Sequence, residues 1–169
     1  MFVCLGNICR SPAAQWLFQE TVSQAEMQSH FHVESSGIGG WHVGESPDAR
    51  MRRAMQERGL RMPSKAQQFK SDHLNSFDYI VVADPSIMDS IQDMRQRKSR
   101  RGSGDESTKS SLLYMTDFLR KEDMSLVREK DTIPDPYYCG NFSDVVQMLE
   151  GMAQNLLSHI AEEQGLSAA

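Results

Sequence analysis

The chain has 169 residues, of which 39% are hydrophobic and 24% charged, and its net charge is −5. This length suits one domain with a sizeable core. The acidic balance argues against nucleic acid as the main partner, because proteins that bind nucleic acid usually carry a basic surplus. No apolar run could span a membrane, and Arg10 interrupts the N-terminal apolar run before a signal peptide could form. With three cysteines, we expect a cytoplasmic protein without a disulfide framework.

The first half of the chain predicts two strands, each followed by a helix. MFVCLG at the N-terminus reads as the end of a strand that runs into a turn. Pro12 suits the first turn of the helix that follows, where apolar residues recur at helical spacing. FHVESSG predicts a second strand that ends at Gly37. Ser46 is the candidate N-cap of the next helix, and Gly59 its stop.

The second half predicts two more strands and two longer helices. FDYIVVAD is a continuous apolar run, which is typical of a parallel strand covered on both faces, and Asp84-Pro85 then opens a helix. SSLLYMTDF is expected to be the fourth strand, and a broad apolar stripe that starts at Phe142 predicts a long amphipathic helix. We therefore expect a single α/β domain over 1–169. It would have three layers, a four-stranded parallel sheet with helices on both faces, in the doubly wound, flavodoxin-like arrangement.

One low-complexity stretch, RQRKSRRGSGDESTKS, separates the last two predicted strands. It is basic at first and then rich in Gly and Ser, so we expect a mobile, solvated loop at about 97–110. A docking patch for an acidic partner is the alternative interpretation.

The sequence VCLGNICRSP points to a loop with its own chemistry. A loop between a strand and a helix N-terminus collects free N–H groups and the positive end of the helix dipole, which makes an anion site. Gly6 lets the backbone approach a ligand, Asn7 tolerates left-handed geometry, and the planar fork of Arg10 suits two phosphate oxygens. Such surroundings favour a thiolate at Cys4, to which Ser11 could donate a hydrogen bond. One loop could therefore bind a phosphoryl group and attack it.

Three other interpretations of the paired cysteines are possible. A buried, inert thiol would not explain the neighbouring Arg, Gly and Asn. Half of a zinc site would need Cys139 with His30 or His32, and the C-x4-C spacing is wider than usual. A permanent Cys4–Cys9 disulfide suits neither the spacing nor the expected compartment.

The loop VCLGNICRSP resembles the C-x5-R signature of the low-molecular-weight protein tyrosine phosphatases. The resemblance continues through GWHVGESPDARMRRAMQERGL, FDYIVVAD and the DPYY sequence at 135–138. It implies an enzyme without a metal or organic cofactor, in which a phosphocysteine forms and is then hydrolysed. By motif position, Cys4 is the nucleophile, Arg10 the phosphate clamp and Asp135 the general acid and base. Asn7 and Ser11 are expected to support the loop and the thiolate.

The residues around Asp135 agree with that role. A phenol oxygen, with a pKa of about 10, leaves far better when it is protonated as the bond breaks. Pro134 and Pro136 fix the backbone on either side of the carboxyl group. An ordinary Asp-Pro turn is the alternative, and it would be preferred if the cysteine motif were absent.

Aromatic residues near the acid indicate the substrate. Tyr137 and Tyr138 could form one wall for a phenyl ring and Trp41 the opposite wall, although Trp41 could instead be a core residue. Leu5 and Ile8 are expected at the apolar rim. By resemblance, relatives that act on phosphoarginine carry Thr in place of Ile8. We therefore expect phosphotyrosine proteins or small aryl phosphates as partners and inorganic phosphate as product.

The resemblance also implies that Cys9 can pair with Cys4 after oxidation, while simple packing in the loop is the alternative role for Cys9. Other functions considered are a phosphoarginine or small-molecule phosphomonoester phosphatase, an arsenate reductase and a non-catalytic phosphotyrosine-binding module. By resemblance, arsenate reductases need further cysteines near 80–90, where this chain has IVVADPSIMDS. A binding module would be expected to lack the nucleophile or the acid.

Overall fold

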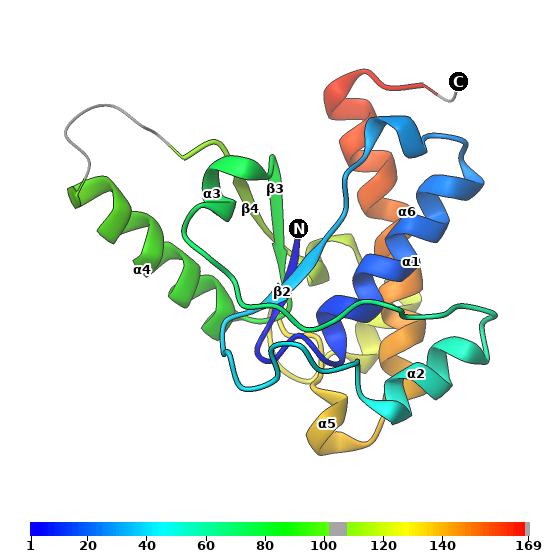
Figure 1. Cartoon of the computed structure of the whole chain (residues 1–169). Coiled ribbons are helices and arrows are strands. Elements are labelled where there is room, and N and C mark those ends of the chain that lie inside the picture. The colour runs from blue at the N-terminus through cyan, green and yellow to red at the C-terminus, as the bar shows by residue number, and fades with distance from the viewer. Residues whose placement is uncertain (102–107, 168–169) are drawn as a thin grey trace.

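The computed structural model describes residues 1–101 and 108–167, and a four-stranded parallel sheet lies at its centre (Figure 1). The strands are β1 (Phe2–Cys4), β2 (Ser35–Gly37), β3 (Tyr79–Val82) and β4 (Ser111–Tyr114). They lie in the order β2-β1-β3-β4, and each neighbouring pair is parallel. The predicted sheet is confirmed. Because β1 lies between two partners, the loop that follows it emerges at the middle of the sheet edge where ligands bind in such folds.

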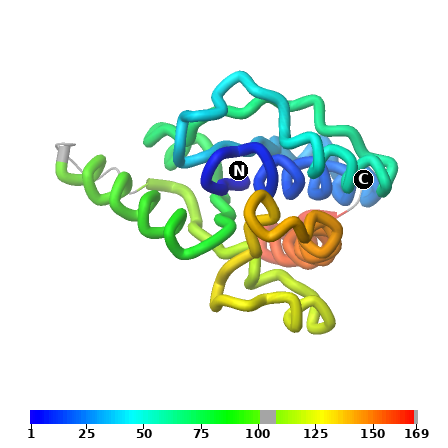
Figure 2. The backbone as a smooth tube through the Cα atoms, turned by 90° about the horizontal axis from the view of Figure 1, so that it is seen from below, coloured from blue at the N-terminus to red at the C-terminus, as the bar shows by residue number. Residues whose placement is uncertain are grey.

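The helices surround this sheet. The α-helices of the described residues are α1 (Arg10–Gln24), α2 (Ala49–Gln56), α3 (His73–Ser76), α4 (Pro85–Arg101), α5 (Pro136–Cys139) and α6 (Phe142–Gln164). Short 3₁₀ helices are η1 (Gln28–His30), η2 (Met115–Phe118) and η3 (Lys121–Leu126). Figures 1 and 2 show α1 and α6 side by side on one side of the sheet and α4 on the other. The predicted three-layer, doubly wound α/β fold is thus confirmed.

Each face of the sheet has its own hydrophobic core. Successive strand side chains point to opposite faces, so Phe2 and Val81 pack with α1 and α6 whereas Val3 and Ile80 pack with α4. The predicted apolar stripe of α6 is buried in the first of these cores. The two cores fix the strand ends, and with them the loops at the carboxyl edge of the sheet.

The start of α2 differs from the prediction. The N-cap is Asp48, whose side chain accepts a hydrogen bond from the backbone N–H of Arg50 at 2.8 Å. Ser46, the predicted cap, instead accepts a hydrogen bond from Lys65 Nζ at 2.9 Å. Ser and Asp both cap helices well, so residue type alone does not decide which of the two caps α2. The hydrogen bond from Lys65 engages Ser46 and leaves Asp48 as the cap.

The basic stretch after β3 also differs in part. Helix α4 continues to Arg101, so residues 97–101 of the predicted loop are helical. Residues 102–107 lie outside the described residues, and the predicted mobility of the loop stays a prediction. None of the helices within 1–101 and 108–167 has an apolar stretch of the length that crossing a membrane requires.

Candidate active site

The segment from Cys4 to Arg10, here called the cysteine loop, joins β1 to α1. Asn7 at its centre has a φ of 58°, the left-handed geometry that Asn tolerates. Its side chain is buried and fully engaged: Oδ1 accepts from the N–H of Gln67 at 2.9 Å, and Nδ2 donates to Ser35 Oγ at 3.0 Å and Ser11 Oγ at 2.8 Å. Asn7 therefore ties the loop to β2 and to α1.

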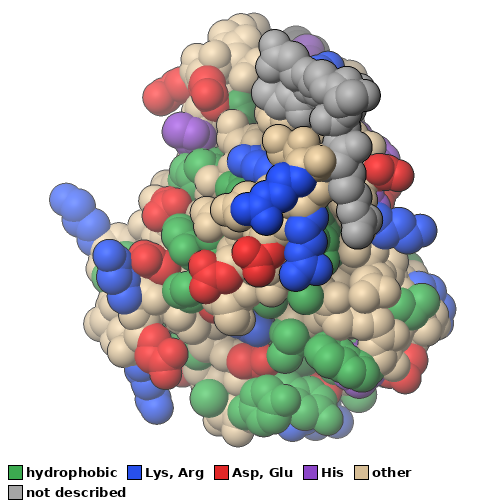
Figure 3. All heavy atoms as spheres, turned by 90° about the vertical axis from the view of Figure 1, so that its left-hand side faces the viewer, with side chains coloured by type: hydrophobic (Ala, Val, Ile, Leu, Met, Phe, Trp, Pro, Cys, Tyr) green, Lys and Arg blue, Asp and Glu red, His purple; other side chains and the backbone are tan. Residues whose placement is uncertain are grey.

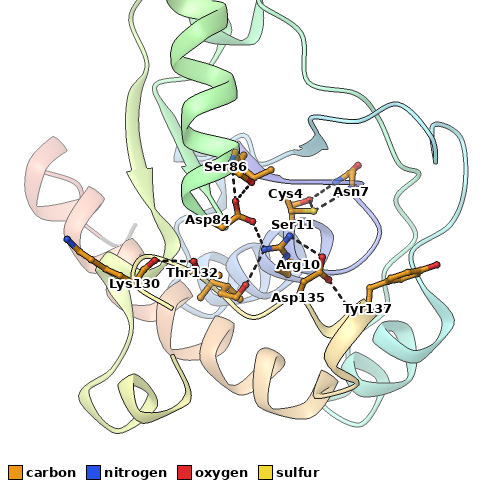
Figure 4. Close-up of polar contacts among 12 residues, drawn as sticks. Cys4, Asn7, Arg10, Ser11, Asp84, Ser86, Lys130, Thr132, Asp135 and Tyr137 are labelled. Carbon is orange, nitrogen blue, oxygen red and sulfur yellow. Dashed lines mark hydrogen bonds and ion pairs between the residues drawn. The ribbon is translucent and has the colours of Figure 1, made fainter. Parts of the chain in front are cut away.

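The thiol of Cys4 lies inside this loop and is almost fully buried (Figure 4). Its Sγ is 3.0 Å from Ser11 Oγ and accepts a hydrogen bond from the backbone N–H of Asn7 at 3.3 Å. Two polar groups are thus in place to stabilise a thiolate. This is the arrangement that the sequence predicted for Cys4, Asn7 and Ser11.

The loop also needs a glycine on the neighbouring strand. A Cβ at Gly37 would lie 2.8 Å from the backbone N of Asn7 and 2.8 Å from the carbonyl carbon of Gly6. The sequence marked Gly37 only as the end of a strand. The structure shows that the end of β2 must lack a side chain for the cysteine loop to pack against it.

We expect Gly37→Ala to lower kcat/KM for an aryl phosphate by about 10²-fold, the cost of moving reacting groups by about 1 Å. The added methyl group would push the cysteine loop away from β2. Gly40→Ala is the matched control, because there the three atoms nearest to the new Cβ all belong to the flexible side chain of Gln68, the nearest at 3.0 Å. Circular dichroism should show that both variants fold, and equal rates for the two would contradict the prediction.

Arg10 begins α1 and is 4% exposed. Its Nη1 donates to Asp84 Oδ2 at 2.8 Å and to the carbonyl of Ile133 at 3.1 Å, and its Nη2 donates to Asp135 Oδ2 at 3.3 Å. Burial would lower the pKa of Arg10, but the charges of Cys4, Asp135 and Asp84 outweigh burial and hold this pKa above its usual value. Arg10 therefore remains a cation at the base of the site.

Asp84 is a site residue that the sequence reasoning did not select. Its Oδ1 caps α4 by accepting hydrogen bonds from the N–H of Ile87 at 3.1 Å and from Ser86 Oγ at 2.6 Å. Its Oδ2 pairs with Arg10 and so orients the guanidinium (Figure 4). Burial would raise the pKa of Asp84, but these hydrogen bonds and the charge of Arg10 lower it overall. Ionised Asp84 therefore adds to the free energy of unfolding. This contribution is complete above the pKa of Asp in the unfolded chain, about 3.9, and is lost as the pH falls through the lower pKa of the folded state. The sequence signal for Asp84 was the Asp-Pro pair just after β3, because β3 lies next to β1 and the cysteine loop.

Asp135 lies at the N-cap of α5 and faces the cysteine loop (Figure 4). Its Oδ1 accepts from the N–H of Tyr137 at 3.1 Å, and its Oδ2 contacts Arg10. Pro136 occupies the first helical position, which suits its fixed φ. The carboxyl group is a quarter exposed, so solvent and a ligand can both reach it.

A cavity of about 250 Å³ opens above the cysteine loop. It is lined by Cys4, Leu5, Gly6, Ile8, Cys9, Arg10, Trp41, His42, Asp135, Tyr137 and Tyr138. The structure thus brings together ten of the twelve predicted site residues at this cavity. The other two, Asn7 and Ser11, do not line the cavity, and their side chains support the cysteine loop by hydrogen bonds to each other and to β2.

His42 lines the cavity but was not among the residues that the sequence predicted for the site. Its Nδ1 lies 2.7 Å from Glu45 Oε2, and its ring lies beside Gly6. Its position directly after Trp41 was the signal that could have found it.

The rim of the cavity is aromatic and exposed. Trp41 is 69% exposed, so the alternative of a core Trp is wrong, and its indole ring occupies the place where a Cβ of Gly39 would lie. Tyr137 and Tyr138 pack edge to face with ring centroids 5.1 Å apart, and both are exposed. Figure 3 shows hydrophobic side chains gathered at the lower end of the molecule, the end at which α5 lies in Figure 1. These rings could flank a phenyl group from both sides.

The remaining cysteines differ from Cys4. Cys9 is buried, and burial, with the nearby charge of Asp48, raises its pKa well above the usual range. It is therefore a neutral thiol at rest, and its pairing with Cys4 after oxidation stays a prediction. Cys139 is exposed at the end of α5 and does not line the cavity. Within residues 1–101 and 108–167, no group of three His, Cys, Asp or Glu side chains lies close enough to hold a metal ion.

Known proteins of similar sequence match this chain over most of its length. The family model described as low molecular weight phosphotyrosine protein phosphatase matches residues 1–166. The low molecular weight protein-tyrosine-phosphatase YfkJ of Bacillus subtilis is 32% identical over 167 residues, which cover 98% of this chain and 97% of that protein. The low molecular weight phosphotyrosine protein phosphatase of Sus scrofa is 31% identical over 144 residues, or 85% of this chain and 82% of that protein.

Solved structures show the same relationship. A protein tyrosine phosphatase from Entamoeba histolytica superposes with a TM-score of 0.79 at 30% identity and covers 97% of this chain and 96% of that chain. A Drosophila arginine phosphatase superposes with a TM-score of 0.79 at 26% identity, covering 94% and 95%. The family model includes both the cysteine loop and the DPYY segment. The chain therefore belongs to the low-molecular-weight protein tyrosine phosphatase family.

Proposed function

We propose that this protein hydrolyses phosphotyrosine through a phosphocysteine intermediate on Cys4. The observation that carries the proposal is the position of Cys4 Sγ below a cavity that Arg10 and Asp135 also line. In the first step, the thiolate attacks phosphorus and the bond to the phenol oxygen breaks, while Asp135 gives its proton to that oxygen. In the second step, Asp135 takes a proton from water, which attacks the phosphocysteine and releases inorganic phosphate and the thiolate.

Arg10 and the loop backbone stabilise the charge that moves during both steps. The guanidinium offers parallel N–H donors that match two phosphoryl oxygens. The loop N–H groups and the N-terminus of α1 add partial positive charge at the same place. Neither step requires a metal ion or an organic cofactor. A reducing compartment such as the cytoplasm would keep Cys4 a free thiol.

Substrate choice rests on the cavity rim. The exposed rings of Trp41, Tyr137 and Tyr138 favour a planar aryl group over the flexible chain of a phosphoarginine. Ile8 adds apolar surface to the same cavity. Because an arginine phosphatase has the same fold, phosphoarginine is the second candidate substrate, and Ile8 is the residue that argues against it.

The test compares matched phosphotyrosine and phosphoarginine peptides in the presence of EDTA, with phosphate release as the measurement. We expect the wild type to favour phosphotyrosine, and Ile8→Thr to move the ratio of kcat/KM values toward phosphoarginine by about 10-fold, the range that one pocket contact gives. Acid quenching followed by mass spectrometry should find phosphate on Cys4. A wild-type preference for phosphoarginine, or loss of activity in EDTA, would contradict the proposal.

A further inference from the structure

The side chain of Arg50 joins the two halves of the site without lining the cavity. Arg50 belongs to the first turn of α2. Its side chain contacts Asp48 on one side and, on the other, the segment 135–142, here called the acid segment. The acid segment contains Asp135, α5 and the first residue of α6. No sequence motif marks Arg50 as a site residue.

On one side, Arg50 is fixed to the cysteine loop through Asp48. The Nε and Nη2 atoms of Arg50 donate to the two carboxylate oxygens of Asp48 at 3.1 and 2.9 Å, a two-point contact that sets the plane of the guanidinium. The backbone N–H of Asp48 in turn donates to the carbonyl of Ile8 at 2.9 Å. Arg50 is therefore two hydrogen-bonded steps from the loop that carries Cys4.

On the other side, the guanidinium contacts two aromatic rings of the acid segment. The Cζ atom of Arg50 lies 5.3 Å from the ring centroid of Tyr137 and 4.8 Å from that of Phe142. Both distances are within the range of cation–π attraction. Tyr137 donates its N–H to Asp135, and Phe142 begins α6, so Arg50 contacts the acid segment on both sides of Gly140.

We propose that Arg50 is a positioning residue that holds Asp135 over the cysteine loop by fixing Tyr137 and Phe142. This inference rests on the proposed function, because it assigns Arg50 an effect on the proton that Asp135 donates. A planar cation suits the place, since it can pair with both carboxylate oxygens of Asp48 while it also lies over the rings of Tyr137 and Phe142. Lysine cannot do both, because its ammonium is a point charge without a plane.

A comparison of two substrates tests the assignment. Phenyl phosphate needs the proton of Asp135, whereas p-nitrophenyl phosphate has a leaving group that departs more easily without it. We expect Arg50→Ala to lower kcat/KM for phenyl phosphate about 10-fold more than for p-nitrophenyl phosphate, and Arg50→Lys to fall between wild type and Arg50→Ala. The Ki of inorganic phosphate should change little, because the cysteine loop itself keeps its contacts.

Arg53→Ala is the matched control, since Arg53 is exposed one turn further along α2, and its rates should equal those of the wild type. In an Asp135→Ala background, Arg50→Ala should have little further effect on phenyl phosphate. Two results would overturn the inference and leave Arg50 as a residue that only stabilises the fold. One is an equal loss of kcat/KM on both substrates in Arg50→Ala. The other is an undiminished effect of Arg50→Ala on phenyl phosphate in the Asp135→Ala background. Absence of wild-type turnover would instead contradict the proposed function.

Discussion

Replacing Cys4 by serine is expected to lower kcat on aryl phosphates by about 10⁴-fold or more, the scale of losing a nucleophile. The hydroxyl group is close in size to the thiol, and Ser11 Oγ and the N–H of Asn7 remain in place around it. A serine at this position would stay protonated, because two hydrogen-bonding groups and a helix N-terminus cannot ionise an alcohol at neutral pH. The variant should therefore bind phosphoryl groups without transferring them.

Two measurements separate this outcome from a damaged fold. The Kd of Cys4→Ser for inorganic phosphate should stay close to that of the wild type, because Arg10 and the cysteine loop are unchanged. Cys139→Ser is the matched control, since it makes the same atomic change at an exposed position outside the cavity, and its kcat should be normal. Substantial turnover by Cys4→Ser would show that another group attacks phosphorus.

The cysteine loop shows why a local motif can be interpreted from its sequence alone. Its strand, its turn and its helix N-terminus are consecutive along the chain, so the roles of Gly6, Asn7 and Arg10 follow from short-range geometry. The apolar run of β3 and the buried stripe of α6 are equally local patterns. For the same reason, the parallel sheet with helices on both faces was predictable from the alternation of strands and helices.

Contacts between distant segments were not predictable in this way. Asp84 reaches Arg10 across 74 positions, and the carbonyl of Ile133 reaches it across 123. The requirement at Gly37 arises only where β2 meets the cysteine loop. The sequence predicts the N-cap of α2 at Ser46, two residues before the observed cap Asp48, because the sequence does not reveal the tertiary contact between Ser46 and Lys65. Each of these depends on how the sheet brings strand ends together, which spacing along the chain does not specify.

The Asp135 variants are expected to show a loss that depends on the leaving group. Asp135→Ala should lower kcat/KM for phenyl phosphate by about 10²-fold to 10³-fold, within the range of general acid catalysis. The reason is that phenol, with a pKa of about 10, leaves slowly as an anion. The loss for p-nitrophenyl phosphate should be clearly smaller, because the nitro group stabilises the departing phenolate. The measurement is the ratio of the two kcat/KM values in wild type and variant.

Asp135→Asn distinguishes proton donation from positioning. The amide can still accept a hydrogen bond from the N–H of Tyr137 and lie beside Arg10, but it has no proton to give to the leaving group. If Asp135 is the acid, the asparagine variant should lose as much activity on phenyl phosphate as the alanine variant. Asp144→Asn, an exposed change in the first turn of α6, should have no effect. Near-normal activity of Asp135→Asn would reduce Asp135 to an N-cap of α5, and the proton would have to come from another group.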